Sequence, residues 1–136
     1  MIVVDTNTIA YLYLPTEYTS DVEKLLDLDS YWVAPALWRS EFRNVLASYI
    51  RKNLIDIDTV CQMQSEAELV LAHNEYQVDS VTVLKLSAES GCSAYDCEFI
   101  SLAKMLNVKL ITADKKLLNT FPAIAITAKN YLAGLV

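Results

Sequence analysis

Glycine and histidine are scarce in this 136-residue sequence, and their scarcity excludes several kinds of catalytic site. Gly91 and Gly134 are the only glycines. Neither lies in a loop between a strand and a helix that could cradle phosphate, so Walker A and dinucleotide-binding loops are excluded. His73 is the only histidine, which excludes a catalytic histidine pair and leaves any Ser-His-Asp triad to this one residue. Because His73 lies in the polar stretch AHNEYQ, we expect a solvated surface residue.

Cysteines, prolines and long apolar runs are also few. The spacing of Cys61, Cys92 and Cys97 matches no zinc motif, so we interpret all three as reduced and structural. Two glycines, three prolines and 54% hydrophobic residues leave no room for a disordered linker and predict a single domain over residues 1–136. No basic segment precedes the first apolar run, and no run reaches the length of a membrane span. We therefore expect a cytoplasmic protein that does not contact a membrane.

The charge balance is acidic, with 17 Asp and Glu residues against 11 Lys and Arg residues and a net charge of −6. Such a surplus of negative charge opposes binding to the phosphates of a nucleic acid. The objection weakens if several of the acids hold cations.

Short apolar runs alternate with amphipathic stretches along the chain, which predicts strands separated by helices. The runs with the length and composition of strands are 1–4, 31–34, 108–112 and 123–127. Helices are expected up to residue 14, from about residue 20, over 35–52, 56–74, 79–90, 94–107 and 113–121, and at the C-terminus. Strands separated by helices pair in parallel through right-handed crossovers. We therefore expect a three-layer α/β/α sandwich with a mainly parallel central sheet, in which IVVD and KLITAD are inner strands.

Two of these helices carry specific packing expectations. The pattern after residue 20 predicts that Val22, Leu25, Leu26 and Leu28 turn inward. Pro35 suits the first turn of the long helix that follows it, because that position needs no backbone N–H donor.

An acid follows each of the two expected inner strands. Asp5 comes directly after the first strand, and Asp114 ends the KLITAD segment. Ligands bind at the carboxyl ends of parallel strands, where these two acids would meet. Asp5 can instead cap the helix that follows it, which is an ordinary role for aspartate. Capping alone explains the repeated placement less well.

Two further acids lie at the border of an apolar helix face. Asp96 falls in the first turn of a helix that Ser93 is expected to cap, and Glu41 lies at the edge of the apolar face of the long helix. Each has an ordinary alternative, because Asp96 suits a helix macrodipole and Glu41 can pair with Arg43 or a neighbouring lysine on a solvated flank. The helical phase leaves open whether Glu98 also faces the same site.

The four acids, if they meet, require a cation. Two carboxylates about 5 Å apart repel by about 3 kcal/mol at an effective dielectric constant near 20. An all-oxygen donor set without histidine or cysteine favours a hard divalent ion, Mg²⁺ or alternatively Mn²⁺. Two such ions would reduce the net charge from −6 to −2, which makes a phosphate substrate acceptable. The expected metal ligands are Asp5, Glu41, Asp96 and Asp114.

Four segments of the chain resemble a PIN domain of the VapC toxin type. They are VVDTNTIAYLY, SEFRNVL, SAYDCEFISLAKMLNVKLITAD and KKLLNTF. The resemblance spans nearly the whole chain and implies a Mg²⁺-dependent endoribonuclease, the toxin of a toxin–antitoxin pair, usually a homodimer. By this resemblance the catalytic acidic quartet is Asp5, Glu41, Asp96 and Asp114. The polar residues expected to support that quartet are Thr6, Asn7 and Thr112.

Basic residues beside the acids are candidates for contacts with RNA phosphates. They are Arg39, Arg43, Lys115 and Lys116. Each can also be an ordinary solvated base.

Two rival interpretations remain. A phosphatase of the haloacid dehalogenase type also begins with a strand and an aspartate, but it needs a second acid two residues later, where this chain has Asn7. A catalytically degenerate PIN-like module that only binds a partner or RNA would suit the acidic surface. Such a module would not explain why four carboxylates occupy unfavourable positions.

Overall fold

The computed structural model describes residues 1–135, in which five strands alternate with eight helices. Val136, the last residue of the expected domain over 1–136, lies outside the described residues. The strands are β1 (Ile2–Val4), β2 (Trp32–Pro35), β3 (Glu75–Tyr76), β4 (Leu110–Ile111) and β5 (Ala125–Ile126). The helices are α1 (Thr6–Tyr13), α2 (Thr19–Leu28), α3 (Trp38–Arg51), α4 (Ile57–Val70), α5 (Ser80–Ser90), α6 (Ala94–Leu106), α7 (Lys115–Thr120) and α8 (Ala128–Leu132).

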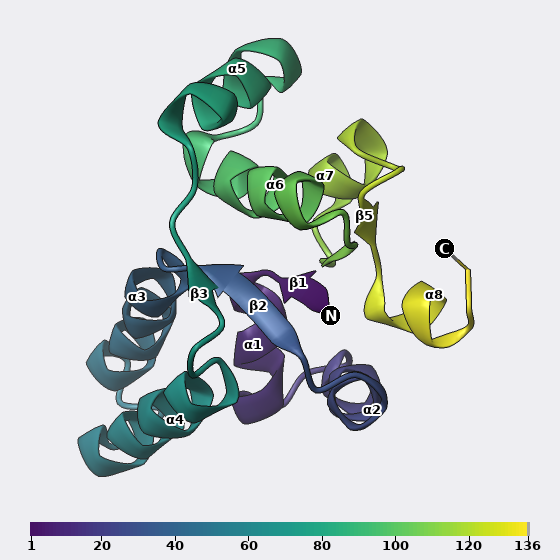
Figure 1. Ribbon diagram of the computed structural model, residues 1–136. Helices are drawn as coiled ribbons and strands as arrows, with labels where there is room; N and C mark the ends of the chain where they lie inside the picture. Colours follow the sequence, from purple (N-terminus) through teal and green to yellow (C-terminus); the bar gives the residue numbers. More distant parts are fainter. Residues whose placement is uncertain (136) are drawn as a thin grey trace.

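The strands form one parallel sheet in the order β3-β2-β1-β4-β5. Val3 of β1 is in register with Val33 of β2 on one side and with Leu110 of β4 on the other. Helices α1 to α4 lie on one side of the sheet and α5 to α7 on the other, the upper side in Figure 1. The expected three-layer α/β/α sandwich is thereby confirmed, and β1 and β4 are inner strands as expected. Because all five strands run in parallel, their carboxyl ends meet at one edge.

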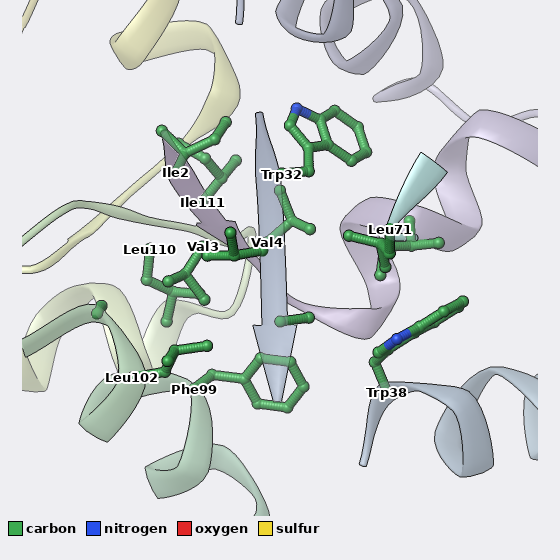
Figure 2. Packing of buried hydrophobic residues seen from close by; sticks show 14 of the residues in the cluster. Ile2, Val3, Val4, Trp32, Trp38, Leu71, Phe99, Leu102, Leu110 and Ile111 are labelled. Carbon is green, nitrogen blue, oxygen red and sulfur yellow. The ribbon is translucent and has the colours of Figure 1, made fainter. Parts of the chain in front are cut away.

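The core fills both sides of this sheet. Every residue of β1, β2 and β4 is buried, as expected for strands that are covered on both faces. Figure 2 shows Phe99 and Leu102 of α6 close to Leu110, while Trp38 and Leu71 lie away from them beyond β2. The buried strands hold the residues that follow them in fixed positions at the carboxyl edge.

Helix caps predicted from the sequence recur in the structure. The Ser93 hydroxyl accepts a hydrogen bond from the Asp96 backbone N–H at 3.0 Å and so begins α6. Gly91 ends α5 with a φ of 71°, in the left-handed region that favours glycine. His73 is exposed, in agreement with its expected surface position.

Several sequence-based expectations about packing were wrong. Pro35 ends β2 and does not begin a helix, because α3 starts three residues later, at Trp38. Leu28, expected to turn inward, is 64% exposed at the end of α2. Cys61 is exposed on α4 and is therefore not a structural core residue, whereas the other two cysteines are buried.

The helix expected over residues 56–74 ends at Val70, and β3 follows in a stretch to which the sequence assigned no strand. Among the helices of residues 1–135, none has both the length and the apolarity that crossing a membrane requires.

Candidate active site

Four carboxylates line one cavity of about 230 Å³ at the carboxyl edge of the sheet. We call this cavity the carboxylate cleft and define it by the polar residues that line it, which are Asp5, Thr6, Asn7, Glu41, Asn44, Asp96 and Asp114. The acids come from four different places in the chain: the ends of β1 and β4, the first turn of α3 and the first turn of α6. The parallel sheet brings them together because its strands end at the same edge.

Asp5 both caps a helix and faces the cleft. Its Oδ1 atom accepts hydrogen bonds from the Thr8 backbone N–H at 2.8 Å and from the Thr8 hydroxyl at 2.7 Å. Desolvation by burial raises the pKa of the Asp5 carboxyl, hydrogen bonds from Thr112 and Thr8 lower it, and the charge of Asp114 raises it. The capping role and a role in the cleft are therefore compatible, since the cap uses one carboxylate oxygen.

Glu41 is held in the cleft by a single hydroxyl. The Thr6 hydroxyl donates a hydrogen bond to Glu41 Oε1 at 2.7 Å and joins α1 to α3. Burial raises the pKa of Glu41, the Thr6 hydrogen bond lowers it, and the charges of Asp96 and Asp5 raise it further. The ion pair with Arg43 that the sequence allowed is not formed.

Asp96 and Asp114 line the same cleft, and the negative charge of Asp114 acts on the Asp96 carboxyl. Burial and then the charge of Asp114 raise the pKa of Asp96, while hydrogen bonding with Ser93 and the charge of Lys116 lower it. Asp114 Oδ1 caps α7 by accepting a hydrogen bond from the Leu117 backbone N–H at 3.0 Å. Asp114 thus begins a helix and Asp96 lies in the first turn of one, and both also line the cleft.

The polar residues predicted to support the acids divide between two positions. Thr6 and Asn7 line the cleft, whereas Thr112 is buried behind it and accepts a hydrogen bond from the Asp114 backbone N–H at 3.0 Å. Glu98, which the helical phase left open, lines a different cavity. Asn44 lines the cleft and was not predicted, although its position three residues after Glu41 on α3 places it on the same helix face.

The predicted phosphate-binding residues do not share one environment. Arg39 faces away from the cleft: its guanidinium pairs with Glu75 at 2.6 Å and with Glu68 at 2.7 Å. This engagement removes Arg39 from the set of bases that are available to a phosphate. Lys116 is exposed, and its Nζ donates a hydrogen bond to the Gly91 carbonyl at 2.9 Å.

Arg43 and Lys115 are exposed and belong to none of the ion pairs within residues 1–135. They are therefore free to contact a phosphate.

No base forms an ion pair with a cleft carboxylate within residues 1–135, although the charge of Lys116 lowers the pKa of Asp96. In the part of the chain that the structure describes, the ion pairs involve Asp29, Glu68 and Glu75 and none of the four acids. The acids surround the cleft without clustering tightly, since no three Asp, Glu, His or Cys side chains among residues 1–135 stand close enough to hold a metal ion. Their oxygen-only chemistry nevertheless suits a hard divalent cation, which would offset the repulsion that adds to burial in raising the pKa values of Asp5, Glu41 and Asp96.

The family model for the PIN domain matches residues 2–121 of this chain. The chain belongs to the PIN domain family. This PIN protein is 29% identical to Ribonuclease VapC3 of Pyrobaculum aerophilum, in an alignment that covers 90% of this chain and 96% of the relative. The resemblance seen in the sequence is thereby confirmed, and the haloacid dehalogenase alternative is set aside.

Solved structures share the PIN fold at low sequence identity. PAE2754 from Pyrobaculum aerophilum superposes with a TM-score of 0.78 at 19% identity and covers 98% of this chain and 95% of its own. FitAcB from Neisseria gonorrhoeae gives a TM-score of 0.71 at 17% identity, covering 95% and 99%. A toxin–antitoxin complex from Klebsiella pneumoniae gives 0.67 at 14% identity, covering 94% and 98%. These likenesses show the fold alone.

Proposed function

We propose that this PIN protein is a Mg²⁺-dependent endoribonuclease and the toxin of a toxin–antitoxin pair. The observation that carries the proposal is a single cleft lined by four carboxylates, none of which forms an ion pair within residues 1–135. The name of the relative Ribonuclease VapC3 supports RNA as the substrate class. Catalysis is assigned to Asp5, Glu41, Asp96 and Asp114.

The four carboxylates would hold one or two Mg²⁺ ions, with Mn²⁺ as an alternative. A bound divalent ion lowers the pKa of a coordinated water and offsets charge on the phosphate that is attacked. The protein keeps the ligands in place: Thr6 orients Glu41, and Thr8 orients Asp5. Because Asp5 and Asp114 also cap helices, their carboxylates cannot swing away from the cleft without breaking backbone hydrogen bonds.

The RNA backbone would reach the cleft past exposed bases. Lys115 and Lys116 follow Asp114 directly at the start of α7, and each can contact a phosphate beside the one that is cleaved. Arg43 lies one turn after Arg39 on the same side of α3, where its charge lowers the pKa of Glu75, so this side chain is further from the cleft. We leave Arg39 out of this surface because Glu75 and Glu68 already bind its guanidinium.

The proposed partner is a cognate antitoxin protein, and we expect a homodimer and a single PIN-like domain over residues 1–136. The Klebsiella pneumoniae neighbour is a toxin–antitoxin complex, which supports a protein partner for this chain. The homodimer is an expectation from the family resemblance.

The competing proposal is a PIN module that binds without cleaving. The wide spacing of the acids favours it, because no three of them already form a metal site within residues 1–135. A metal titration by calorimetry separates the two proposals. The nuclease should bind Mg²⁺ in the cleft, and Asp96→Asn should weaken that binding.

Cleavage of total RNA with and without Mg²⁺ tests the nuclease directly. We expect hydrolysis that EDTA stops and that Asp96→Asn lowers by about 100-fold or more, since the variant removes charge from the cleft but keeps the side-chain shape. Asp58→Asn is the matched control, because Asp58 also lies in the first turn of a helix but is exposed and outside the cleft. Equal cleavage by Asp96→Asn and Asp58→Asn, or cleavage that survives EDTA, would contradict the proposal.

A further inference from the structure

A second cavity, of about 310 Å³, lies next to the carboxylate cleft. We call it the tyrosine pocket and define it by the residues that the inference uses, which are Tyr11, Tyr18, Asp21, Thr112, Ala113 and Lys129. They come from α1, the α1–α2 turn, α2, the end of β4 and α8. The volume is at the lower end of the range for small-molecule sites, so the pocket suits one planar ring system rather than a duplex.

The tyrosine pocket and the carboxylate cleft share a wall. Ala113 lines the pocket and Asp114 lines the cleft, and consecutive Cα atoms are about 3.8 Å apart. Thr8 also lines the pocket, while its hydroxyl donates to Asp5 in the cleft at 2.7 Å. The pocket is therefore the neighbouring cavity for a nucleotide whose phosphate lies in the cleft.

Two stacked tyrosines give the pocket an aromatic wall. The rings of Tyr11 and Tyr18 are 4.9 Å apart between centroids, with 28° between their planes. Tyr18 is 42% exposed, so a large part of its surface is open to a ligand. Proteins that bind single-stranded RNA use such rings to stack unpaired bases.

Asp21 and Lys129 suit the edge of a base and its phosphate, while the exposed Glu17 adds a second acid to the lining of the pocket. Asp21 is half-buried, and it belongs to none of the ion pairs found within residues 1–135. A carboxylate only accepts hydrogen bonds, and guanine presents adjacent N–H donors on one edge, whereas uracil has no amino group. Lys129 is exposed at the pocket and supplies a positive charge for a neighbouring phosphate.

We propose that the tyrosine pocket binds the base next to the scissile phosphate of the RNA, with guanine preferred. Tyr11 and Tyr18 stack with the base, Asp21 accepts from its amino edge, and Lys129 binds an adjacent phosphate. The proposal rests on the proposed ribonuclease function, and it adds a determinant of where the RNA is cut.

Nucleotide binding in the absence of metal tests the pocket independently of cleavage. We would titrate the ¹⁵N-labelled chain with GMP, AMP, CMP and UMP in EDTA and follow the backbone amide resonances. GMP should shift the amides of Tyr18, Asp21, Ala113 and Lys129 and bind about 10-fold more tightly than UMP, a ratio typical of one discriminating hydrogen-bond pair. If none of the four nucleotides shifts the amide resonances of these residues, the proposal that the pocket binds a base is wrong. Equal affinity for all four would overturn the guanine assignment.

Variants connect the shifts to the named side chains. Tyr18→Ala should weaken GMP binding by roughly 5- to 150-fold, the loss that corresponds to one stacked base. Tyr31→Ala is the matched control, since Tyr31 is 47% exposed and lines neither cavity. Asp21→Asn should reduce the preference for GMP over UMP. Unchanged GMP binding in Tyr18→Ala would overturn the proposal.

The pocket proposal and the nuclease proposal can be disproved independently. If the wild-type chain cleaves RNA but Tyr18→Ala cleaves at the same sites and rate, the pocket is wrong and the nuclease stands. If GMP binds in the pocket but no RNA is cleaved with Mg²⁺, the assignment of the base to a scissile phosphate is wrong together with the nuclease. Reduced cleavage beside guanine in Tyr18→Ala, with Tyr31→Ala unchanged, would support both.

Discussion

Helix α3 contributes to two groups of acids. One group forms ion pairs with a base, and the other forms none within residues 1–135. Arg39, in its first turn, pairs with Glu75 and Glu68, and the Trp38 indole N–H donates to Glu75 at 2.8 Å. Glu41, two residues later, lines the carboxylate cleft, where no base pairs with an acid within residues 1–135. At 100° per residue the two side chains point to different sides of the helix. One helix therefore separates a neutralised cluster from an uncompensated one.

The pKa values of the two clusters move in opposite directions. Hydrogen bonding to Arg39 lowers the pKa of Glu75 despite its partial burial. Burial raises the pKa of Asp5, Glu41 and Asp96, and neighbouring acids raise these values further. An acid that stabilises a fold has a cation beside it, whereas an acid kept without one costs stability. The difference supports the proposal that the cleft acids serve a ligand, in addition to the helix caps that Asp5 and Asp114 provide.

The largest effect is expected from breaking the neutralised cluster. Arg39→Met keeps much of the aliphatic stem but leaves Glu75 and Glu68 without their cation, so we expect a loss of about 2 kcal/mol in the free energy of unfolding at pH 7. Because the pKa of Glu75 is lowered in the folded chain, its stabilisation is present above the ordinary glutamate value of about 4.3 and is lost as the pH falls below it. Urea unfolding at several pH values measures this.

Arg51→Met is the control for that substitution. Arg51 is exposed in the last turn of α3 and belongs to none of the ion pairs among residues 1–135. We expect a change within about 0.5 kcal/mol. If Arg39→Met is as stable as Arg51→Met at pH 7, the cluster does not stabilise the fold, and the contrast with the cleft disappears.

The cleft acids could be predicted from the sequence because local rules position them. Asp5 and Asp114 follow buried strands, and parallel pairing brings strand ends together. Ser93 caps α6 and so fixes the place of Asp96 in the first turn of that helix. Glu41 follows from helical phase, and the same phase places Asn44, which was not predicted, on the same face of α3. Each acid is positioned on its own strand or helix by residues nearby in the chain, and the pairing of β1 with β4 then joins two distant segments.

Features that depend on distant residues could not be predicted. Strand β3 has two residues in a polar stretch, and it exists because it pairs with β2 and because Arg39 binds Glu75. Arg39 was predicted to contact phosphate, but its partners Glu68 and Glu75 are distant in the sequence, so its ion pairs with them could not be predicted either. The stacking of Tyr11 on Tyr18 arises where the chain turns between α1 and α2, which no periodicity reveals.

A smaller effect of opposite sign is expected from removing charge in the cleft. Asn at position 5 can still cap α1, so Asp5→Asn should raise the melting temperature by about 2 to 4 °C at pH 7 in EDTA. Because the folded pKa of Asp5 is raised, wild type and variant should match below the ordinary aspartate value of about 3.9. The wild type should become the less stable of the two as the pH rises through the raised value.

Added Mg²⁺ sharpens this second test. A cation that binds the folded cleft stabilises the wild type according to its affinity, and it should stabilise Asp5→Asn less. Calorimetric melting should therefore show Asp5→Asn melting above the wild type in EDTA and below it with Mg²⁺. A variant that is less stable than the wild type in EDTA would show that the cleft acids are compensated after all, as those around Arg39 are.

The smallest effect is expected from the bases beside the cleft. Lys115→Gln removes one exposed charge next to Asp114, so affinity for single-stranded RNA in EDTA should fall by about 2- to 3-fold, and the salt slope of log K should decrease by about 0.7. Lys24→Gln, a control on the exposed face of α2, should leave both quantities unchanged. Fluorescence anisotropy at four salt concentrations measures them. Equal slopes for both variants would remove Lys115 from the RNA surface and leave Lys116, Lys129 and the cations bound in the cleft to attract the polyanion.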